Sequence, residues 1–277
     1  MEFMDLLKAV ILGMVEGLTE FAPVSSTGHM IVVDDMWLGS EQLFGQSVAN
    51  TFKVVIQLGS ILAVVIIFRE RFMDLLGIRR LGKQVAKHGQ SRLKLTQVIA
   101  GLIPAAALGL LFEDYIDTYL FTTERVLIGL AAGALFMIAA DWLAPKRPKV
   151  ETVDQITYKQ ALTVGLIQCL SLWPGFSRSG STISGGVLLG MSHRAASDFT
   201  FIMAVPIMAG ASFLSLLKNW QYFTFDALPF FIVGFISAFV FALISIRFFL
   251  KLINRIKLVP FAVYRLILTA VIYFVYF

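Results

Sequence analysis

The chain has 277 residues, of which 58% are hydrophobic and only 15% are charged, and its formal net charge is +5. An average soluble domain is about half apolar and about a quarter charged, so this composition excludes a disordered chain, a disulfide scaffold and an ordinary cytosolic enzyme. It indicates an all-α polytopic membrane protein. Short positive loops between apolar spans account for the basic excess, so we expect no nucleic-acid partner.

Six apolar stretches are long enough to cross a bilayer as helices, which takes roughly 17–25 residues. They are 51–68, 93–112, 124–143, 197–217, 229–250 and 260–277. Two further apolar segments, 4–33 and 158–190, are interrupted in the middle by Pro, Gly and Ser. Such an interruption disfavours one continuous helix. We expect each segment to be a kinked span or a re-entrant hairpin that enters and leaves on the same side.

Loop charges favour the hairpins. Basic residues gather in the segments 69–94, 144–159 and 247–257 and at Arg194. The positive-inside rule places all of these regions in the cytoplasm. The number of spans between them then requires each interrupted segment to start and finish on one side of the membrane. The alternative is one additional full crossing in each half, with the N-terminus inside.

The two interrupted segments also resemble each other in sequence. The identical aligned pairs are Gly13/Gly165, Leu18/Leu170, Ser25/Ser177 and Gly28/Gly180. Chance similarity between apolar sequences is the competing explanation, but the shared Ser-x-x-Gly at the interruption favours a duplication. Three spans follow each segment, and an odd number of crossings inverts the second unit. The sequence therefore predicts one integrated membrane domain of two inverted repeats, 1–150 and 151–277, as in many transporters.

Glu16 and Glu20 stand four residues apart before the first interruption, so their carboxylates share one face of a helix. Two carboxylates inside an apolar segment need a partner, a proton or a cation. Together they suit a hard divalent ion, because such ions prefer oxygen ligands. The alternative is that they cap a helix or face headgroup water near the N-terminus.

Hydroxyl groups and backbone N–H groups at the start of a helix form an anion site, and this pattern occurs at both interruptions. The residues concerned are Ser25, Ser26, Thr27 and Gly28 in the first and Ser177, Arg178, Ser179 and Gly180 in the second. Arg178 can hold a phosphate with two parallel hydrogen bonds. Helix capping alone explains the hydroxyls but not the arginine. His29 lies at the same interruption and is a candidate base or nucleophile.

At these residues the sequence closely resembles the bacterial undecaprenyl-diphosphate phosphatases, the bacitracin-resistance family, over essentially the whole chain. The resemblance is carried by Glu16-Gly17-Leu18-Thr19-Glu20-Phe21, Pro23-Val24-Ser25-Ser26-Thr27-Gly28-His29 and Pro174-Gly175-Phe176-Ser177-Arg178-Ser179-Gly180. It implies an enzyme of the bacterial plasma membrane that removes one phosphate from undecaprenyl diphosphate. That reaction recycles the carrier lipid for peptidoglycan synthesis and confers bacitracin resistance. A divalent cation, Mg²⁺ or Ca²⁺, and an active site facing the periplasm are implied as well.

The resemblance also assigns roles to individual residues. Glu16 and Glu20 correspond to the acidic pair, which we expect to hold the cation. Ser26 and His29 correspond to the nucleophile and the base, in an order that the resemblance leaves open, and Arg178 corresponds to the phosphate-binding arginine. The mechanistic hypothesis is that Ser26 activated by His29, or His29 itself, attacks the terminal phosphorus. The residues expected to bind the substrate around them are Ser25, Thr27, Gly28, Ser177, Ser179 and Gly180.

A secondary transporter or lipid flippase is the main alternative, because inverted repeats and intramembrane carboxylates suit it as well. The acid-phosphatase-like lipid phosphatases are a second alternative, since Ser26-Thr27-Gly28-His29 is similar to one of their motifs. That family needs a histidine at a position that Ser184 occupies here, which argues against it. Besides the lipid substrate, we expect membrane lipids as partners. The sequence permits a homodimer but does not require one.

Overall fold

Helices form every regular element in the part of the chain that the computed structural model describes, which is residues 3–78, 92–220 and 225–277. Five helices in these ranges are long and apolar enough to cross a membrane. They are α4 (Gln46–Ile67), α8 (Thr123–Leu143), α11 (His193–Asn219), α12 (Leu228–Ile256) and α13 (Val259–Tyr276). They correspond to five of the six predicted spans. The predicted all-α polytopic membrane fold is therefore confirmed.

The remaining predicted span, 93–112, corresponds to a bent pair of helices. Its first part is α6 (Leu95–Leu111), which has 17 residues. A bend of 66° separates α6 from a second part, Glu113–Leu120, which consists of α7 (Glu113–Tyr115) and η2 (Ile116–Leu120). A sixth crossing results when the bent pair counts as one span. The prediction placed this span correctly but did not include the bend.

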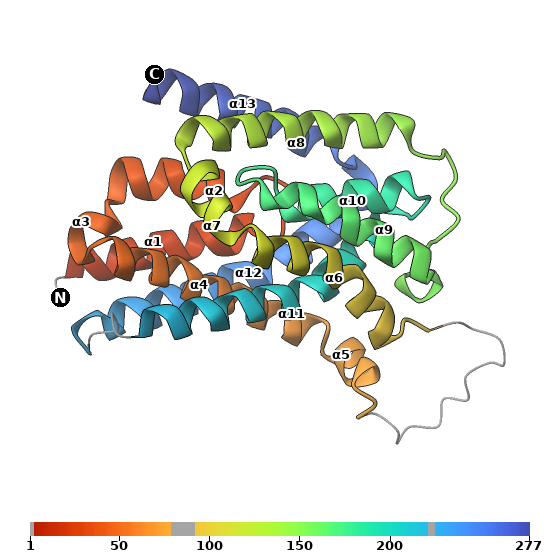
Figure 1. Ribbon diagram of the computed structural model, residues 1–277, viewed down its shortest axis with the longest axis horizontal. Helices are drawn as coiled ribbons and strands as arrows, with labels where there is room; N and C mark the ends of the chain where they lie inside the picture. The colour runs from red at the N-terminus through yellow and green to blue at the C-terminus, as the bar shows by residue number, and fades with distance from the viewer. Residues whose placement is uncertain (1–2, 79–91, 221–224) are drawn as a thin grey trace.

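Both interrupted segments are helical hairpins. The first consists of α1 (Phe3–Thr19), α2 (Ser26–Met30) and the π-helical η1 (Ile31–Leu38), which returns alongside α1. The second consists of α9 (Tyr158–Gln168), η4 (Cys169–Leu172) and α10 (Arg178–Leu188). Figure 1 shows the two hairpins in opposite halves of the bundle, with their turns facing each other near its middle. The turns touch, because the Ser179 hydroxyl donates a hydrogen bond to the Ala22 carbonyl oxygen at 3.2 Å.

The two turns have the same backbone conformation. Ser25 and Ser177 both adopt a positive φ, 69° and 74°, which non-glycine residues rarely do. Each serine then caps the helix that follows, because its hydroxyl oxygen accepts a hydrogen bond from the backbone N–H of Gly28 or Gly180. A strained conformation of this kind costs about 1–3 kcal/mol and persists only where the surroundings hold it. Its recurrence at aligned positions is what a duplicated unit would produce, while the repeat boundaries at 150 and 151 stay a prediction.

Each hairpin packs against a helix of the other half of the chain. On α1, a Cβ at Gly13 or Gly17 would overlap the backbone of α12. On α9, a Cβ at Gly165 would overlap the backbone of α6 at Gly101. Small residues permit such close approach of helices in membranes. Each hairpin is therefore supported along one side, the first by α12 and the second by α6. This packing fixes where the two turns lie.

The basic segments gather at the end of the bundle away from the two chain termini (Figure 1). Arg71 on α5 (Arg69–Leu75) pairs with Asp154 at 2.8 Å, which joins the segments 69–94 and 144–159. Arg69, Arg194 and Arg247 line one pocket beside this pair. Residues 79–91 lie outside the described residues. The grouping agrees with the crossing count, which placed all four basic regions on one side of the membrane.

Candidate active site

The two hairpin turns bring the predicted acids, hydroxyl and arginine into one cluster. The Arg178 guanidinium donates from Nη2 to Glu20 Oε1 at 3.0 Å. The Ser26 hydroxyl donates to the other oxygen of the same carboxylate, Oε2, at 2.6 Å. Glu20, directly after α1, therefore connects the end of that helix to α2, which begins at Ser26, and to α10 from the second half of the chain.

Glu16 lies one helical turn before Glu20 and is only 2% exposed. Its Oε1 atom is buried and has no hydrogen-bond partner among the described residues, and the same is true of the Arg178 Nη1 atom. Buried polar atoms without partners are rare in folded proteins and call for an explanation. A carboxylate oxygen and a guanidinium nitrogen in this state suit a site that receives a cation and an anion.

Whether a divalent cation fits this site depends on the carboxylate oxygens of Glu16 and Glu20. The described residues contain no cluster of three or more His, Cys, Asp or Glu side chains that could enclose a metal ion. Mg²⁺ does not need such a cluster, because it commonly binds through one or two carboxylates and takes its other ligands from water and from substrate phosphates. Glu16 and Glu20 fit that pattern. The cation itself stays a prediction.

His29 points away from Ser26, towards α13. Its Nδ1 atom lies 2.8 Å from the Ser25 carbonyl oxygen and its Nε2 atom lies 2.7 Å from the Tyr264 hydroxyl. A carbonyl oxygen only accepts, so Nδ1 carries the hydrogen, and in the neutral ring Nε2 accepts from Tyr264. The two rings are stacked, with their centroids 5.6 Å apart.

His29 makes no hydrogen bond to Ser26 in this arrangement, so the activation of Ser26 by His29 stays a prediction that these contacts do not support. Ser26 donates its hydrogen bond to Glu20, and both ring nitrogens of His29 are already paired with other groups. The reason is geometric: the two side chains leave one short helix in different directions, Ser26 towards α1 and His29 towards α13. The base next to Ser26 is a carboxylate rather than an imidazole.

The residues predicted to bind the substrate surround this cluster. Ser25 and Ser177 cap the two helices, as the capping interpretation expected, and Ser179 lies 3.2 Å from Ser177 Oγ. Gly28 packs against the side chain of Leu130 on α8. The other two, Thr27 and Gly180, lie in the first turns of α2 and α10. All six positions lie at the hairpin turns, while their contacts with a ligand stay a prediction.

Two residues of α13 complete the site, and the sequence did not predict either role. Tyr264 is the partner of His29. Arg265 is 0% exposed and donates from Nη2 to the carbonyl oxygens of Gly175 and Phe176, at 2.8 and 3.0 Å, directly before Ser177. An ionisable residue inside a membrane span is a candidate functional residue by default. That rule was enough to single out Arg265, whereas an aromatic residue in a terminal span gives no such indication for Tyr264.

The fold and the site define a multi-pass helical membrane protein with a site of acids, arginine and histidine between two helical hairpins. This chain belongs to the family described as bacitracin resistance protein BacA, whose family model matches residues 9–271. The expected family membership is thereby confirmed over nearly the whole chain.

Similar proteins match the chain from end to end. An undecaprenyl-diphosphatase of Geobacillus sp. (strain WCH70) is 76% identical over 277 residues, which is 100% of both chains. One of Geobacillus kaustophilus (strain HTA426) is 72% identical over the same length and coverage. One of Bacillus subtilis (strain 168) is 62% identical over 272 residues, or 98% of each chain.

Proposed function

We propose that this chain is an integral membrane enzyme that hydrolyses undecaprenyl diphosphate to undecaprenyl phosphate and inorganic phosphate. The observation that carries the proposal is the Arg178–Glu20–Ser26 cluster at the meeting point of the two hairpin turns. It occurs in a member of the BacA family, and the relatives cited above are named undecaprenyl-diphosphatases. The reaction would return the carrier lipid to peptidoglycan synthesis and so protect the cell against bacitracin.

Phosphoryl transfer depends mainly on positioning and on neutralising charge. Arg178 would bind the diphosphate through Nη1, since Nη2 is held by Glu20. Ser26 Oγ would attack the terminal phosphorus while its proton passes to the Glu20 carboxylate across the 2.6 Å hydrogen bond. The bond from that phosphorus to the bridging oxygen breaks, and undecaprenyl phosphate leaves. Water then cleaves the phosphoserine and releases inorganic phosphate. His29 Nε2 is the alternative nucleophile, but it would first have to part from Tyr264.

A divalent cation, Mg²⁺ or Ca²⁺, would be held by Glu16 and Glu20. When bound, it would lower the charge repulsion between the diphosphate and these carboxylates. The proposed orientation has the basic end of the bundle in the cytoplasm and the opposite end, with both termini, in the periplasm. Substrate would enter from the periplasmic side.

Phosphate release from undecaprenyl diphosphate tests the proposal. The purified protein in detergent should release one phosphate per lipid, a chelator should stop the release, and added Mg²⁺ or Ca²⁺ should restore it. Undecaprenyl phosphate should release none, which serves as the control. Substrate binding without phosphate release would instead support the transporter alternative, with Glu16 and Glu20 as its coupling carboxylates. Release that continues in excess chelator would reject the cation while leaving the hydrolysis intact.

Tyr264→Phe tests whether the hydrogen bond to His29 positions the ring. The phenylalanine keeps the stacked ring but loses the hydroxyl group. One hydrogen bond contributes about 0.5–1.5 kcal/mol, so if turnover depends on the position of His29, the alternative nucleophile, we expect about a 2–13-fold fall in kcat. KM should change little, because Tyr264 holds His29 rather than substrate. The matched control is Tyr273→Phe, an exposed tyrosine on the same helix. Equal kcat in the two variants would show that the pairing of Tyr264 with His29 has no influence on turnover.

A further inference from the structure

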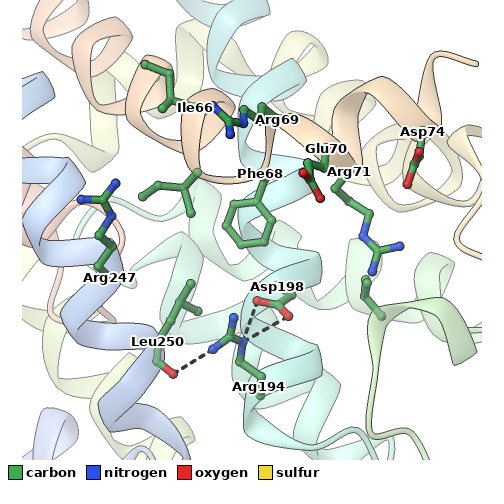
Figure 2. Close-up of a pocket in the computed structure, with 12 residues that line it drawn as sticks. Ile66, Phe68, Arg69, Glu70, Arg71, Asp74, Arg194, Asp198, Arg247 and Leu250 are labelled. Carbon is green, nitrogen blue, oxygen red and sulfur yellow. Dashed lines mark hydrogen bonds and ion pairs between the residues drawn. The ribbon is translucent and has the colours of Figure 1, made fainter. Parts of the chain in front are cut away.

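A second polar site lies at the basic end of the bundle, away from the hairpin turns. It is a pocket of about 660 Å³ between the junction of α4 and α5, the start of α11 and the last turns of α12. Figure 2 shows that its arginines come from these different helices. None of its lining residues belongs to the candidate active site. The pocket therefore needs an explanation of its own.

Two of the four arginines that line the pocket are already paired. Arg71 is held by Asp154 at 2.8 Å. Arg194 is held by Asp198 at 3.0 Å and also donates to the Leu250 carbonyl oxygen. The first pair joins α5 to the segment that contains Asp154, and the bond from Arg194 to Leu250 joins α11 to α12. The positive charges of Arg71 and Arg194 are therefore each balanced by an aspartate.

Arg69 and Arg247 are different. Both are exposed, and neither makes a hydrogen bond or an ion pair with any residue in the described ranges. In Figure 2 they lie on the side of Phe68 where Ile66 is found, while Glu70 and Asp74 lie on the other side. Glu70 and Asp74 therefore do not face Arg69 and Arg247. One half of the pocket keeps a local excess of two positive charges.

Apolar side chains border this positive half. Ile66, in the last turn of α4, is 40% exposed and lines the pocket. Phe68, which follows α4 directly, is partly buried and also lines the pocket. A soluble anion needs arginines but gains nothing from such neighbours, whereas a lipid presents a phosphate and acyl chains together. Basic pockets between membrane helices on the cytoplasmic side are known binding sites for anionic headgroups.

We propose that Arg69 and Arg247 bind the headgroup phosphate of an anionic phospholipid in the leaflet at the basic end of the protein. The guanidinium groups would hold the phosphodiester with charge-assisted hydrogen bonds. The acyl chains would lie against Ile66 and Phe68. This lipid is neither substrate nor product, since it binds at the opposite end of the bundle from the proposed substrate entrance.

Lipid titration with matched variants tests the proposal. Short-chain phosphatidylglycerol is titrated into the detergent-purified protein, and bound lipid is counted by native mass spectrometry. Each arginine near the surface contributes enough that the Arg69→Gln/Arg247→Gln variant should bind about 30-fold more weakly than wild type. The control, Lys251→Gln/Arg255→Gln, removes the same charge from exposed positions on α12 outside the pocket and should bind like wild type.

Two further measurements on the wild-type protein identify the ligand: binding of a neutral lipid and competition by inorganic phosphate. Phosphatidylcholine has the same phosphodiester but no net charge, and it should bind wild type more weakly than phosphatidylglycerol, by a margin that shrinks as salt is added. Inorganic phosphate at millimolar concentration should not displace the lipid. Equal binding of the two lipids, displacement by phosphate, or unchanged binding in the Arg69→Gln/Arg247→Gln variant would each overturn the proposal.

Discussion

Arg178→Ala is expected to lower kcat for phosphate release by about 10²–10³-fold, the range found when a preorganised donor to a developing anion is removed. Arg178 is the cation that the second hairpin contributes to the cluster, and its Nη1 atom is buried without a partner among the described residues. The Phe21 ring, 5.8 Å from the guanidinium carbon, helps to hold the side chain in place. Replacing Arg178 by alanine removes both the charge that would neutralise the diphosphate and the fixed direction of its hydrogen bonds.

Arg178→Lys separates these two contributions. Lysine keeps the positive charge but cannot hold Glu20 and a phosphate in two fixed directions, so its kcat should lie between those of wild type and Arg178→Ala. Arg255→Ala, at an exposed position on α12, should keep the wild-type rate. Melting temperatures of all three variants check that the cluster has not simply collapsed. An alanine variant that keeps more than a tenth of the wild-type kcat would remove Arg178 from the proposed mechanism.

Arg265→Met is expected to cause the largest loss of stability, about 2–4 kcal/mol, because a buried acceptor that loses its donor costs about 1–3 kcal/mol. The guanidinium donates to the carbonyl oxygens of Gly175 and Phe176, and methionine fills similar space without any donor. Both carbonyls belong to the turn that ends in the strained Ser177. For a domain of this size, the melting temperature should fall by about 5–15 °C.

Thermal unfolding in detergent measures this change, with Arg255→Met as the exposed control on the neighbouring helix. Arg265→Lys should recover part of the stability, since an ammonium group can still donate to one or two of the carbonyls. Phosphate release should fall further than the loss of folded protein explains, because the turn that presents Arg178 is no longer fixed. If Arg265→Met melts at the wild-type temperature, other donors satisfy these carbonyls and the anchoring role is wrong.

The sequence predicted the elements that carry local patterns. Apolar length predicted the spans, Pro-Gly-Ser interruptions predicted the hairpins, and the four-residue spacing of Glu16 and Glu20 predicted a shared face. The bend after Leu111 was not predicted, because the apolar stretch ends at Phe112 and nothing in the acidic residues Glu113 and Asp114 indicated that helix continues beyond it. Span lengths are set by the thickness of the bilayer, so composition alone gives them well.

Partner choice within the site was less predictable. The family resemblance suggested that Ser26 and His29 act as a pair, but each side chain finds a partner outside α2. Tyr264 lies 235 positions after His29 in the chain, and no spacing rule connects residues so far apart. Arg265 could be singled out as an arginine inside a span, whereas its partners are backbone carbonyls, which have no sequence signature.

The crossed packing of the hairpins has a consequence for how the protein is made. The close-packing surface of α1 at Gly13 and Gly17 meets α12, which begins only at Leu228, near the end of synthesis. Tyr264, the hydrogen-bond partner of His29, lies on α13 and is synthesised later still. Domains usually fold as they emerge from the ribosome, but the first hairpin inserts long before its supports exist. A nascent or prematurely terminated chain therefore contains Glu16 and Glu20 but lacks the helices that fix the first hairpin. The site can be complete only after α12 and α13 have been synthesised.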